Sequence, residues 1–439
     1  MEEKRGSWSG QLGFIISAAA SAVGLGNLWR FPASVATYGG GVFLLSYIAL
    51  FFAFGVFLLL TEVAIGRATR LSPIEAFRKL NRRWVFVGWL GTVIPFLILP
   101  YYCVIGGWCT KYLCAYLFAG AAPDFAVFVG SAPETILMMM IFVAMTFLFI
   151  WLGVRKGVER SNKVMLPALL FLVIAIAVFV VCQPSSREGL KFYLVPDFSA
   201  LCANGRFSPA LAGKVVLAGM GQMFFSLSLA MGIMITYGSY VPEEANMPKS
   251  VFHIGFCDTL VAFVAGIIVI PAAFAFGGEE LARSSGPGLM FVSLPQVFAQ
   301  MPSARLVACA FFTLVLFASL TSSISLYETC VASLCDRTGI SRRHSTLAVL
   351  AWTFLAAIPS AVWLGFLDNV DYFTNNILMP VCALSTCIFI GWIVGPDFVR
   401  YEATKHGRDK FPLAGYYGVL IKYIAPAAMV VIFISLVLK

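Results

Sequence analysis

Eleven long apolar segments constrain the fold of this 439-residue chain more than any other feature of its sequence. A helix that crosses a bilayer needs about 20 predominantly apolar residues, and each segment has roughly that length or more. The segments are predicted over residues 11–36, 40–66, 86–117, 135–153, 161–182, 211–240, 250–276, 304–334, 345–365, 374–395 and 414–437. With 60% hydrophobic and 12% charged residues, the chain has too few polar side chains to solvate a water-soluble domain of this size. We therefore predict an all-α integral membrane protein whose residues 1–439 form a single transmembrane domain.

Positive charge is unevenly distributed along the chain, which has a formal net charge of +9. Lysine and arginine gather in alternate short loops near residues 67–83, 155–163, 337–343 and 400–410, whereas the loop AGAAPDFAVFVGSAPE has none. This positive-inside pattern predicts a cytoplasmic N-terminus in the cell inner (plasma) membrane, and an odd number of helices then leaves the C-terminus outside. The placement favours the lipid bilayer as the partner of these charges and argues against nucleic acid.

Cysteine and histidine form no catalytic or metal-binding pattern. The 11 cysteines include no CxxC pair, and none of the three histidines clusters with cysteines. An enzyme is therefore not expected. Cys182 and Cys202 flank a predicted outer loop near residues 183–210, and the sequence leaves open whether they pair. This loop and a second one near residues 277–303 are expected to contain small helices.

Two of the apolar segments are interrupted in the middle. The first is broken at SAVGLGN and the sixth at FFSLSLAMG, five segments later. Matched interruptions in two halves are typical of inverted-repeat transporters with a site at the membrane midplane. We predict a 5+5 inverted-repeat core with discontinuous first and sixth helices. Its repeats are residues 11–182 and 211–395, and 414–437 is an extra helix. Helix packing through small residues is the alternative explanation of either break alone.

Several longer stretches resemble the neurotransmitter:sodium symporter family, and within it the bacterial amino-acid transporters of the leucine-transporter type. They are WSGQLGFIISAAASAVGLGNLWRFP, GGGVFLLSY, TEVAIGR, PYYCVIGGW, GQMFFSLSLAMGIMITYGSYV and FASLTSSISL. The resemblance implies sodium-coupled symport of neutral hydrophobic L-amino acids, aliphatic to aromatic, into the cell by alternating access. It also implies two Na⁺ ions.

The resemblance assigns oxygen ligands to each ion. The first Na⁺ is expected at the Ala22 carbonyl, the Asn27 side chain, Ser226 and Asp258. The second is expected at the carbonyls of Ala20, Val23 and Ala318 and the hydroxyls of Thr321 and Ser322. Asp258 departs from the leucine transporter, which has an asparagine there, and Ala262 stands where chloride-dependent relatives have a serine. Because an ionisable group at this depth is functional by default, we infer that Asp258 supplies the negative charge and that no chloride is required.

The substrate site implied by the family is largely apolar. Monoamine carriers have an aspartate at the position of Gly24, so an amino-acid substrate is expected to bring its own carboxylate. The expected site residues are Ser21, Ala22, Leu25, Gly26, Ile98, Tyr102, Phe225, Ser226, Ser228, Ala230, Met231, Ser322 and Leu326. Met231 replaces a bulkier phenylalanine of the leucine transporter, which predicts room for large side chains.

The family also implies gates on both sides of this site. Arg30 and Asp371 resemble the outer charge pair, above a lid formed by Phe225 and Tyr102. The residues that resemble the inner lock are Arg5, Trp8, Tyr240 and Asp336. Gly157 and Pro167 have the spacing that relatives use to unwind the fifth helix, and Glu62 matches a residue of the polar network below the outer gate.

Two other functions stay open at this point. A proton-coupled amino-acid transporter or exchanger can use the same fold, and an amino-acid sensor binds its ligand without moving it. The sequence does not identify the preferred amino acid, the stoichiometry, proton antiport, or whether the protein is a monomer or homodimer.

Overall fold

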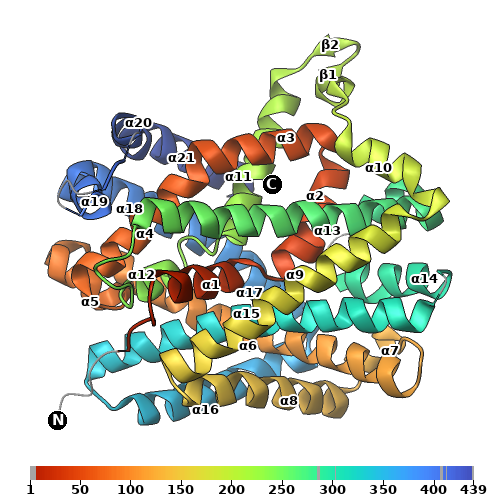
Figure 1. The fold of residues 1–439 in the computed structure, drawn as a ribbon, viewed down its shortest axis with the longest axis horizontal. Coiled ribbons are helices and arrows are strands. Elements are labelled where there is room, and N and C mark those ends of the chain that lie inside the picture. Colours follow the sequence, from red (N-terminus) through yellow and green to blue (C-terminus); the bar gives the residue numbers. More distant parts are fainter. Residues whose placement is uncertain (1–5, 284–286, 302, 406–408, 412, 438–439) are drawn as a thin grey trace.

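The computed structural model describes residues 6–283, 287–301, 303–405, 409–411 and 413–437, and it is almost entirely helical (Figure 1). The longer α-helices are α6 (Val85–Phe118), α8 (Ala132–Trp151), α9 (Arg160–Val181), α11 (Pro209–Ser226), α13 (Met247–Arg283), α15 (Ala304–Thr338) and α16 (Arg342–Val362). Helices of intermediate length are α1 (Gln11–Ala22), α3 (Gly41–Leu50), α4 (Val56–Thr69), α17 (Leu364–Phe373), α18 (Met379–Ile388) and α21 (Ala425–Val437).

Shorter elements connect and extend these helices. The short α-helices are α2 (Phe31–Thr37), α5 (Pro73–Leu80), α7 (Phe125–Gly130), α10 (Arg187–Leu194), α12 (Ile233–Gly238), α14 (Leu294–Ala299), α19 (Pro396–Ala403) and α20 (Ala414–Val419). The π-helical turns are η1 (Gly26–Arg30), η2 (Phe51–Gly55), η4 (Val154–Glu159), η7 (Leu289–Ser293), η8 (Thr374–Leu378), η9 (Phe389–Val394) and η10 (Leu420–Ile424). The 3₁₀ turns are η3 (Arg82–Trp84), η5 (Pro184–Ser186) and η6 (Phe198–Leu201). Strands β1 (Cys202–Ala203) and β2 (Arg206–Phe207) pair antiparallel, with Cys202 opposite Phe207.

Not every predicted segment forms a continuous span. Among the described residues, nine helices are long and apolar enough to cross a membrane, and the bent pair Gln11–Ala22 and Gly26–Thr37 makes ten. The predicted segment 211–240 is divided into α11 and α12 by residues 227–232, so it does not add an unbroken helix. The predicted count of eleven is therefore not confirmed.

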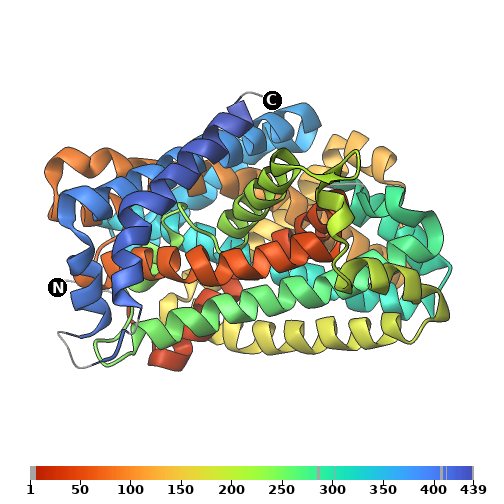
Figure 2. The same ribbon diagram turned by 90° about the horizontal axis from the view of Figure 1, so that it is seen from above.

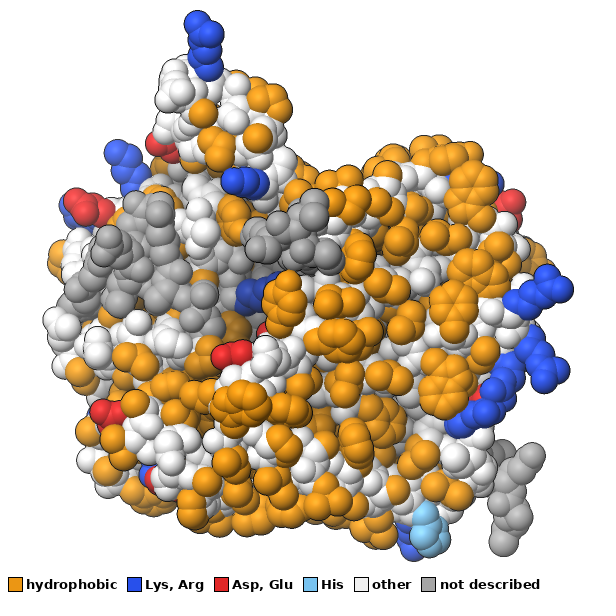
Figure 3. Space-filling model, turned by 180° about the vertical axis from the view of Figure 1, so that it is seen from behind, with side chains coloured by type: hydrophobic (Ala, Val, Ile, Leu, Met, Phe, Trp, Pro, Cys, Tyr) orange, Lys and Arg blue, Asp and Glu red, His pale blue; other side chains and the backbone are white. Residues whose placement is uncertain are grey.

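The outer surface has the properties of a bilayer-embedded protein. Large apolar side chains are exposed on the outward faces of the long helices, among them Leu306 on α15 (70%) and Phe171 on α9 (71%). Figure 3 shows this apolar surface across one face, with several lysine and arginine side chains at the right edge and others at the top and bottom of the view. Since burying these side chains in lipid removes their contact with water, the chain is a multi-pass membrane protein.

The two predicted outer loops do contain small elements. Residues 183–210 form η5, α10, η6 and the β1–β2 hairpin, which projects from the body in Figure 1. The loop near 277–303 includes η7 and α14. Cys182 and Cys202 are not bonded to one another in the structure.

The interior brings the broken helices together. Helix α13 packs against α1, η1 and α2, while α15 runs along α6 and also contacts α1, α8 and α9. Figure 2 shows the C-terminal helices α18 and α21 together on one side of this core. Helices α4 and α12 approach closely, because a Cβ atom on Gly66 would lie 1.9 Å from the Ile235 carbonyl oxygen. Glycine at this position therefore allows the two helices to touch backbone to backbone.

Candidate ion and substrate site

Both predicted breaks are present at the predicted residues. Helix α1 ends at Ala22, Val23 is extended (ψ 97°), and the chain continues as η1 from Gly26. Helix α11 ends at Ser226 and α12 begins at Ile233. Between them Ser228, Ala230 and Gly232 all have left-handed backbone, with φ of 53°, 62° and 68°. Non-helical backbone inside a membrane is tolerated only where protein or a cavity surrounds it.

A buried carboxylate joins the two breaks. Asn27 Nδ2 donates to Asp258 Oδ1 at 2.7 Å, and Ser226 Oγ donates to Asp258 Oδ2 at 2.8 Å. Asn27 Nδ2 also lies 3.1 Å from Ser226 Oγ, and the Asn27 carboxamide oxygen accepts the Gly24 N–H at 3.0 Å. Asn27 and Asp258 are completely buried. The cluster thus contains one side chain from each broken helix and one from α13.

This cluster suits a hard cation. Its groups are a carboxylate, a carboxamide and a hydroxyl, which are the oxygen donors that such ions prefer. No lysine or arginine of the described residues forms an ion pair with Asp258. An ionised carboxylate away from water requires a compensating positive charge or a proton. The side chains present therefore fit the first predicted Na⁺ position.

The residues predicted to bind the second ion lie where α15 meets α1. Thr321 Oγ1 donates to the carbonyls of Phe317 (3.0 Å) and Ala318 (3.1 Å) on its own helix. Ser322 Oγ donates to the Ser21 carbonyl at 3.3 Å, which links α15 to the end of α1. The remaining predicted ligands, the carbonyls of Ala20, Val23 and Ala318, belong to fully buried residues.

A cavity of about 60 Å³ adjoins both groups of ligands. The predicted substrate-site residues that line it are Ser21, Ala22, Leu25, Gly26, Ile98, Tyr102, Phe225, Ser226, Ser228, Met231, Ser322 and Leu326. It is much smaller than the roughly 300 Å³ or more of typical ligand pockets, so the site is nearly closed in this conformation.

Ala230 is the exception among the predicted lining residues. Its backbone N–H donates to Glu62 Oε1 at 2.6 Å, and it is not part of the cavity wall. Its left-handed backbone (φ 62°) directs this N–H toward α4, and its place in the substrate site stays a prediction. Glu62 is itself buried, and its carboxylate accepts a backbone hydrogen bond from the second break.

Sequence reasoning missed part of the cavity wall. The additional residues are Trp29, Tyr101, Ile105, Ile233 and Ser325. Helical periodicity offers a signal for two of them. Ile105 is three residues after Tyr102, and Ser325 is three after Ser322, so each shares a helix face with a predicted residue.

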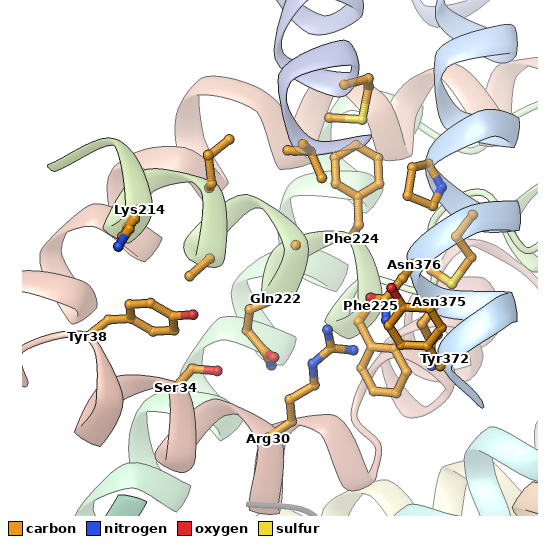
Figure 4. Close-up of a pocket in the computed structure, with 17 residues that line it drawn as sticks. Arg30, Ser34, Tyr38, Lys214, Gln222, Phe224, Phe225, Tyr372, Asn375 and Asn376 are labelled. Atoms are coloured by element: carbon orange, nitrogen blue, oxygen red, sulfur yellow. The ribbon is translucent and has the colours of Figure 1, made fainter. Parts of the chain in front are cut away.

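The outer charge pair is not formed directly. The described ion pairs do not include one between Arg30 and Asp371. Instead the Arg30 guanidinium lies 4.7 Å from the centroid of the Phe225 ring, while Asp371 Oδ1 accepts bonds from Tyr101 (2.8 Å) and Asn375 (2.7 Å). Figure 4 shows Arg30 beside Phe225 and Gln222. Arg30 and Asp371 both line an outer cavity of about 410 Å³.

A second cavity, of about 590 Å³, extends from Arg30 toward α21, where its wall includes Met429 and Ile432. Figure 4 places Tyr38, Ser34 and Lys214 along its polar side and Phe224 near its apolar end. Phe225 lines both this cavity and the binding cavity, so its ring lies between the two.

On the opposite side, the inner lock has partners that the sequence did not reveal. Trp8 Nε1 donates to the Tyr237 carbonyl at 3.0 Å and Trp8 N to the Tyr240 carbonyl at 3.1 Å. Tyr240 Oη donates to Glu328 Oε1 at 2.8 Å, and Arg342 holds both oxygens of this fully buried carboxylate.

Two further lock residues were predicted. Asp336 Oδ2 accepts the Ser72 N–H at 2.7 Å. Arg5 lies outside the described residues.

The residues predicted to unwind the fifth helix lie in a wound segment. Gly157 is part of η4, where a Cβ atom would lie 1.8 Å from the Phe149 carbonyl oxygen. Pro167 lies inside α9, which is continuous from Arg160 to Val181. Because Gly157 has no Cβ atom, the chain can turn tightly between α8 and α9 at this point. A role of Gly157 in unwinding the helix stays a prediction.

The fold and the site define a class of protein. Two broken helices that meet at a buried group of oxygen ligands, beside a cavity within the membrane, are characteristic of secondary transporters. The sequence profile of the sodium:neurotransmitter symporter family matches residues 5–121 and 128–439, and the chain belongs to this family.

Individual relatives extend over nearly the whole chain. The uncharacterized sodium-dependent transporter YhdH of Bacillus subtilis is 33% identical, covering 99% of this chain and 98% of its own length. The sodium- and chloride-dependent GABA transporter 2 of Homo sapiens is 25% identical over 99% of this chain and 80% of its own. The crystal structure of MhsT in complex with L-phenylalanine superposes with a TM-score of 0.87 at 33% identity, covering 98% of this chain and 100% of that one.

Proposed function

We propose that this protein couples the entry of neutral hydrophobic L-amino acids, aliphatic to aromatic, to two Na⁺ ions by alternating access. The observation that carries the proposal is the Asp258 carboxylate, which is buried among Asn27 and Ser226 without a cationic partner in the described residues. It stands beside a cavity whose wall is mainly apolar. A monovalent cation balances the buried carboxylate, and a hydrophobic amino acid fits the mainly apolar cavity.

The substrate class follows from charge and shape. Within the cavity wall, Gly24 leaves the first break without an acidic side chain, so the carboxylate of an amino acid has amide N–H groups and the Tyr102 hydroxyl as partners. Ile98, Met231 and Leu326 form the apolar part. MhsT was crystallised with L-phenylalanine, which supports a large hydrophobic side chain here. Met231 is flexible and adapts to side chains of different size.

Chloride independence follows from the same carboxylate. Asp258 places one negative charge next to the first proposed ion, whereas a neutral site needs an added anion to balance Na⁺. Ala262, one turn further along α13, offers no side-chain hydroxyl to an anion. We propose the plasma membrane as the location, with the N-terminus in the cytoplasm, on the basis of the positive-inside pattern.

Uptake into proteoliposomes tests the function. The purified protein is reconstituted, and entry of labelled leucine, phenylalanine, tryptophan and alanine is measured under inward Na⁺ or K⁺ gradients, with chloride or gluconate as the anion. We expect uptake that requires Na⁺ and is indifferent to chloride. Equal uptake in K⁺ would exclude sodium coupling and favour the proton-coupled alternative, which a pH gradient then tests.

Binding without transport is the remaining alternative. Sodium-dependent substrate binding, measured by scintillation proximity, with no entry into vesicles would identify an amino-acid sensor. Met231→Phe sharpens the substrate assignment, because a larger ring in the wall is expected to lower tryptophan binding by about tenfold more than alanine binding. Leu413→Phe, at an exposed position that does not line the cavity, is the control.

A further inference from the structure

Cations from two other elements hold the connector between α12 and α13, residues 241–246. Arg70 donates to the Val241 carbonyl, Arg67 NH1 donates to the Ala245 carbonyl at 3.0 Å, and Lys405 Nζ donates to the Glu244 carbonyl at 2.6 Å. Arg67 and Arg70 lie at the end of α4, and Lys405 follows α19. A loop with three backbone carbonyls bound by three cations has little freedom to change its position.

Arg67 makes the central connection. Its side chain is only 4% exposed, its Nε donates to Glu402 Oε1 at 2.6 Å, and its NH2 donates to the Glu402 carbonyl. One planar guanidinium therefore joins α4, the 241–246 connector and α19. Lysine has the same charge but a single nitrogen, so it cannot satisfy these acceptors with the same geometry.

On the opposite side, the described segment 8–11 contacts the connector and the residue before it through bonds between neutral groups only. Gln11 of α1 exchanges two hydrogen bonds with the backbone of Asn246, each 3.4 Å long. Trp8 N donates at 3.1 Å to the carbonyl of Tyr240, the residue just before the connector. Charge-assisted bonds are shorter and stronger, so the connector is held more firmly to α4 and α19 than to the segment 8–11.

Helix packing supports the same division. Gly66 on α4 lies against the Ile235 carbonyl of α12, and a Cβ atom on Gly238 would lie 2.6 Å from the Val63 carbonyl oxygen. Such backbone contact cannot slide without a clash. Helix α12 and the connector therefore form one body with the end of α4.

We propose that Arg67 is a positioning residue of the transport cycle, which keeps the 241–246 connector fastened to α4 and α19 while the inner lock opens. In this arrangement the lock opens where the segment 8–11 leaves the connector, and Tyr240 stays in place. The inference rests on the proposed function for the role of the lock, and it adds which side of the lock is fixed. Without Arg67 the connector moves as well, and Gln11 loses its bonds to Asn246.

Hydrogen exchange measured by mass spectrometry on the full chain in lipid nanodiscs tests this proposal. In Arg67→Lys and in Glu402→Gln, backbone amides of the connector and of residues 8–14 are expected to exchange at least about threefold faster than in the parent. Arg78→Gln is the matched control, because Arg78 makes a partly exposed ion pair with Glu75 one turn away on its own helix. It is expected to leave both regions unchanged.

Three results would overturn the proposal. They are unchanged exchange in the connector, faster exchange in the connector alone with residues 8–14 unaffected, and an equal increase throughout α6 and α15. The last would mean general destabilisation, which thermal unfolding of the same samples also detects. The exchange measurement requires no transport, so absence of Na⁺-dependent uptake by the parent would count against the proposed function alone.

Discussion

The two broken helices are both interrupted in the middle, but different residue types keep the two interruptions non-helical. At the first break two glycines, Gly24 and Gly26, stand where neighbouring side chains leave no room, and a Cβ atom on Gly26 would lie 2.6 Å from the Phe225 ring. At the second break two of the three left-handed residues, Ser228 and Ala230, are not glycine. A non-glycine residue in this conformation costs roughly 1 kcal/mol or more, so contacts elsewhere must stabilise it.

Those contacts come from distant parts of the chain. Ala230 N–H donates to Glu62 of α4, and Ser228 Oγ lies 3.4 Å from the Ser21 carbonyl of the first break. The first break is therefore determined by its local sequence, whereas the second is maintained by its neighbours. Accordingly, a larger residue in place of glycine at the first break is expected to lower stability, whereas glycine in place of a left-handed residue at the second break is expected to raise it.

The largest effect is expected where the breaks meet. Asp258→Ala removes the carboxylate that accepts bonds from Asn27 and Ser226, so Na⁺ affinity is expected to fall at least about tenfold. Sodium-dependent binding of a labelled amino acid measures it. Asp258→Asn retains a side-chain oxygen and the size of the residue, and is expected to lose less. Unchanged affinity in Asp258→Ala would show that the first ion does not bind there.

Removal of the support from the second break is expected to have the next largest effect. Glu62→Leu leaves the Ala230 N–H without its acceptor and is expected to destabilise the protein by about 2 kcal/mol. Thermal unfolding in detergent measures the change. Glu62→Gln retains an acceptor oxygen and serves as the control. Equal unfolding temperatures for Glu62→Leu and the parent would mean that the second break is stable without α4.

A steric substitution tests the first break. Gly26→Ala places a methyl group against Phe225 and is expected to cost about 1–2 kcal/mol and to weaken substrate binding, because the ring must move. The double variant Gly26→Ala with Phe225→Leu relieves the contact and is expected to recover stability. If the second substitution recovers nothing, the clash is not the cause of the loss.

The smallest effect has the opposite sign. Ala230→Gly relieves left-handed strain and is expected to raise stability by about 0.5–1 kcal/mol, less the entropy that glycine adds to the unfolded chain. Differential scanning of the two proteins in the same lipid measures it. Ala218→Gly, inside α11, is the control and is expected to destabilise by a similar amount. A loss of stability in both variants would contradict the strain argument.

Prediction from the sequence succeeded where a property is local. Apolar length located the long helices, including α6, which was predicted over 86–117 and extends from Val85 to Phe118. Glycine and serine in apolar surroundings located both breaks. The family resemblance then identified residues that mostly line one cavity, because relatives with the same breaks place the same positions around them.

Interactions between side chains that lie far apart in the sequence were not predicted. Glu328 accepts a bond from Tyr240 and is itself held by Arg342, although nothing near any of these residues in the sequence indicates the contacts. In place of the expected pairing of Arg30 with Asp371, Arg30 lies over the Phe225 ring and Asp371 accepts bonds from Tyr101 and Asn375. Such contacts are set by the packing of whole helices, and a one-dimensional pattern does not contain them.

By itself, the sequence determined that this chain is embedded in a membrane, where its helices are broken, and which oxygen-bearing residues stand at the breaks. These properties depend on apolar length and on the conformational freedom of a few residues. The family resemblance already grouped Asp258 with Asn27 and Ser226, and the structure added the direct hydrogen bonds among them. The tertiary structure alone decided that Glu62 supports the second break and that Arg67 binds the connector. Each of these contacts joins residues on different helices, whose proximity arises only when the helices pack.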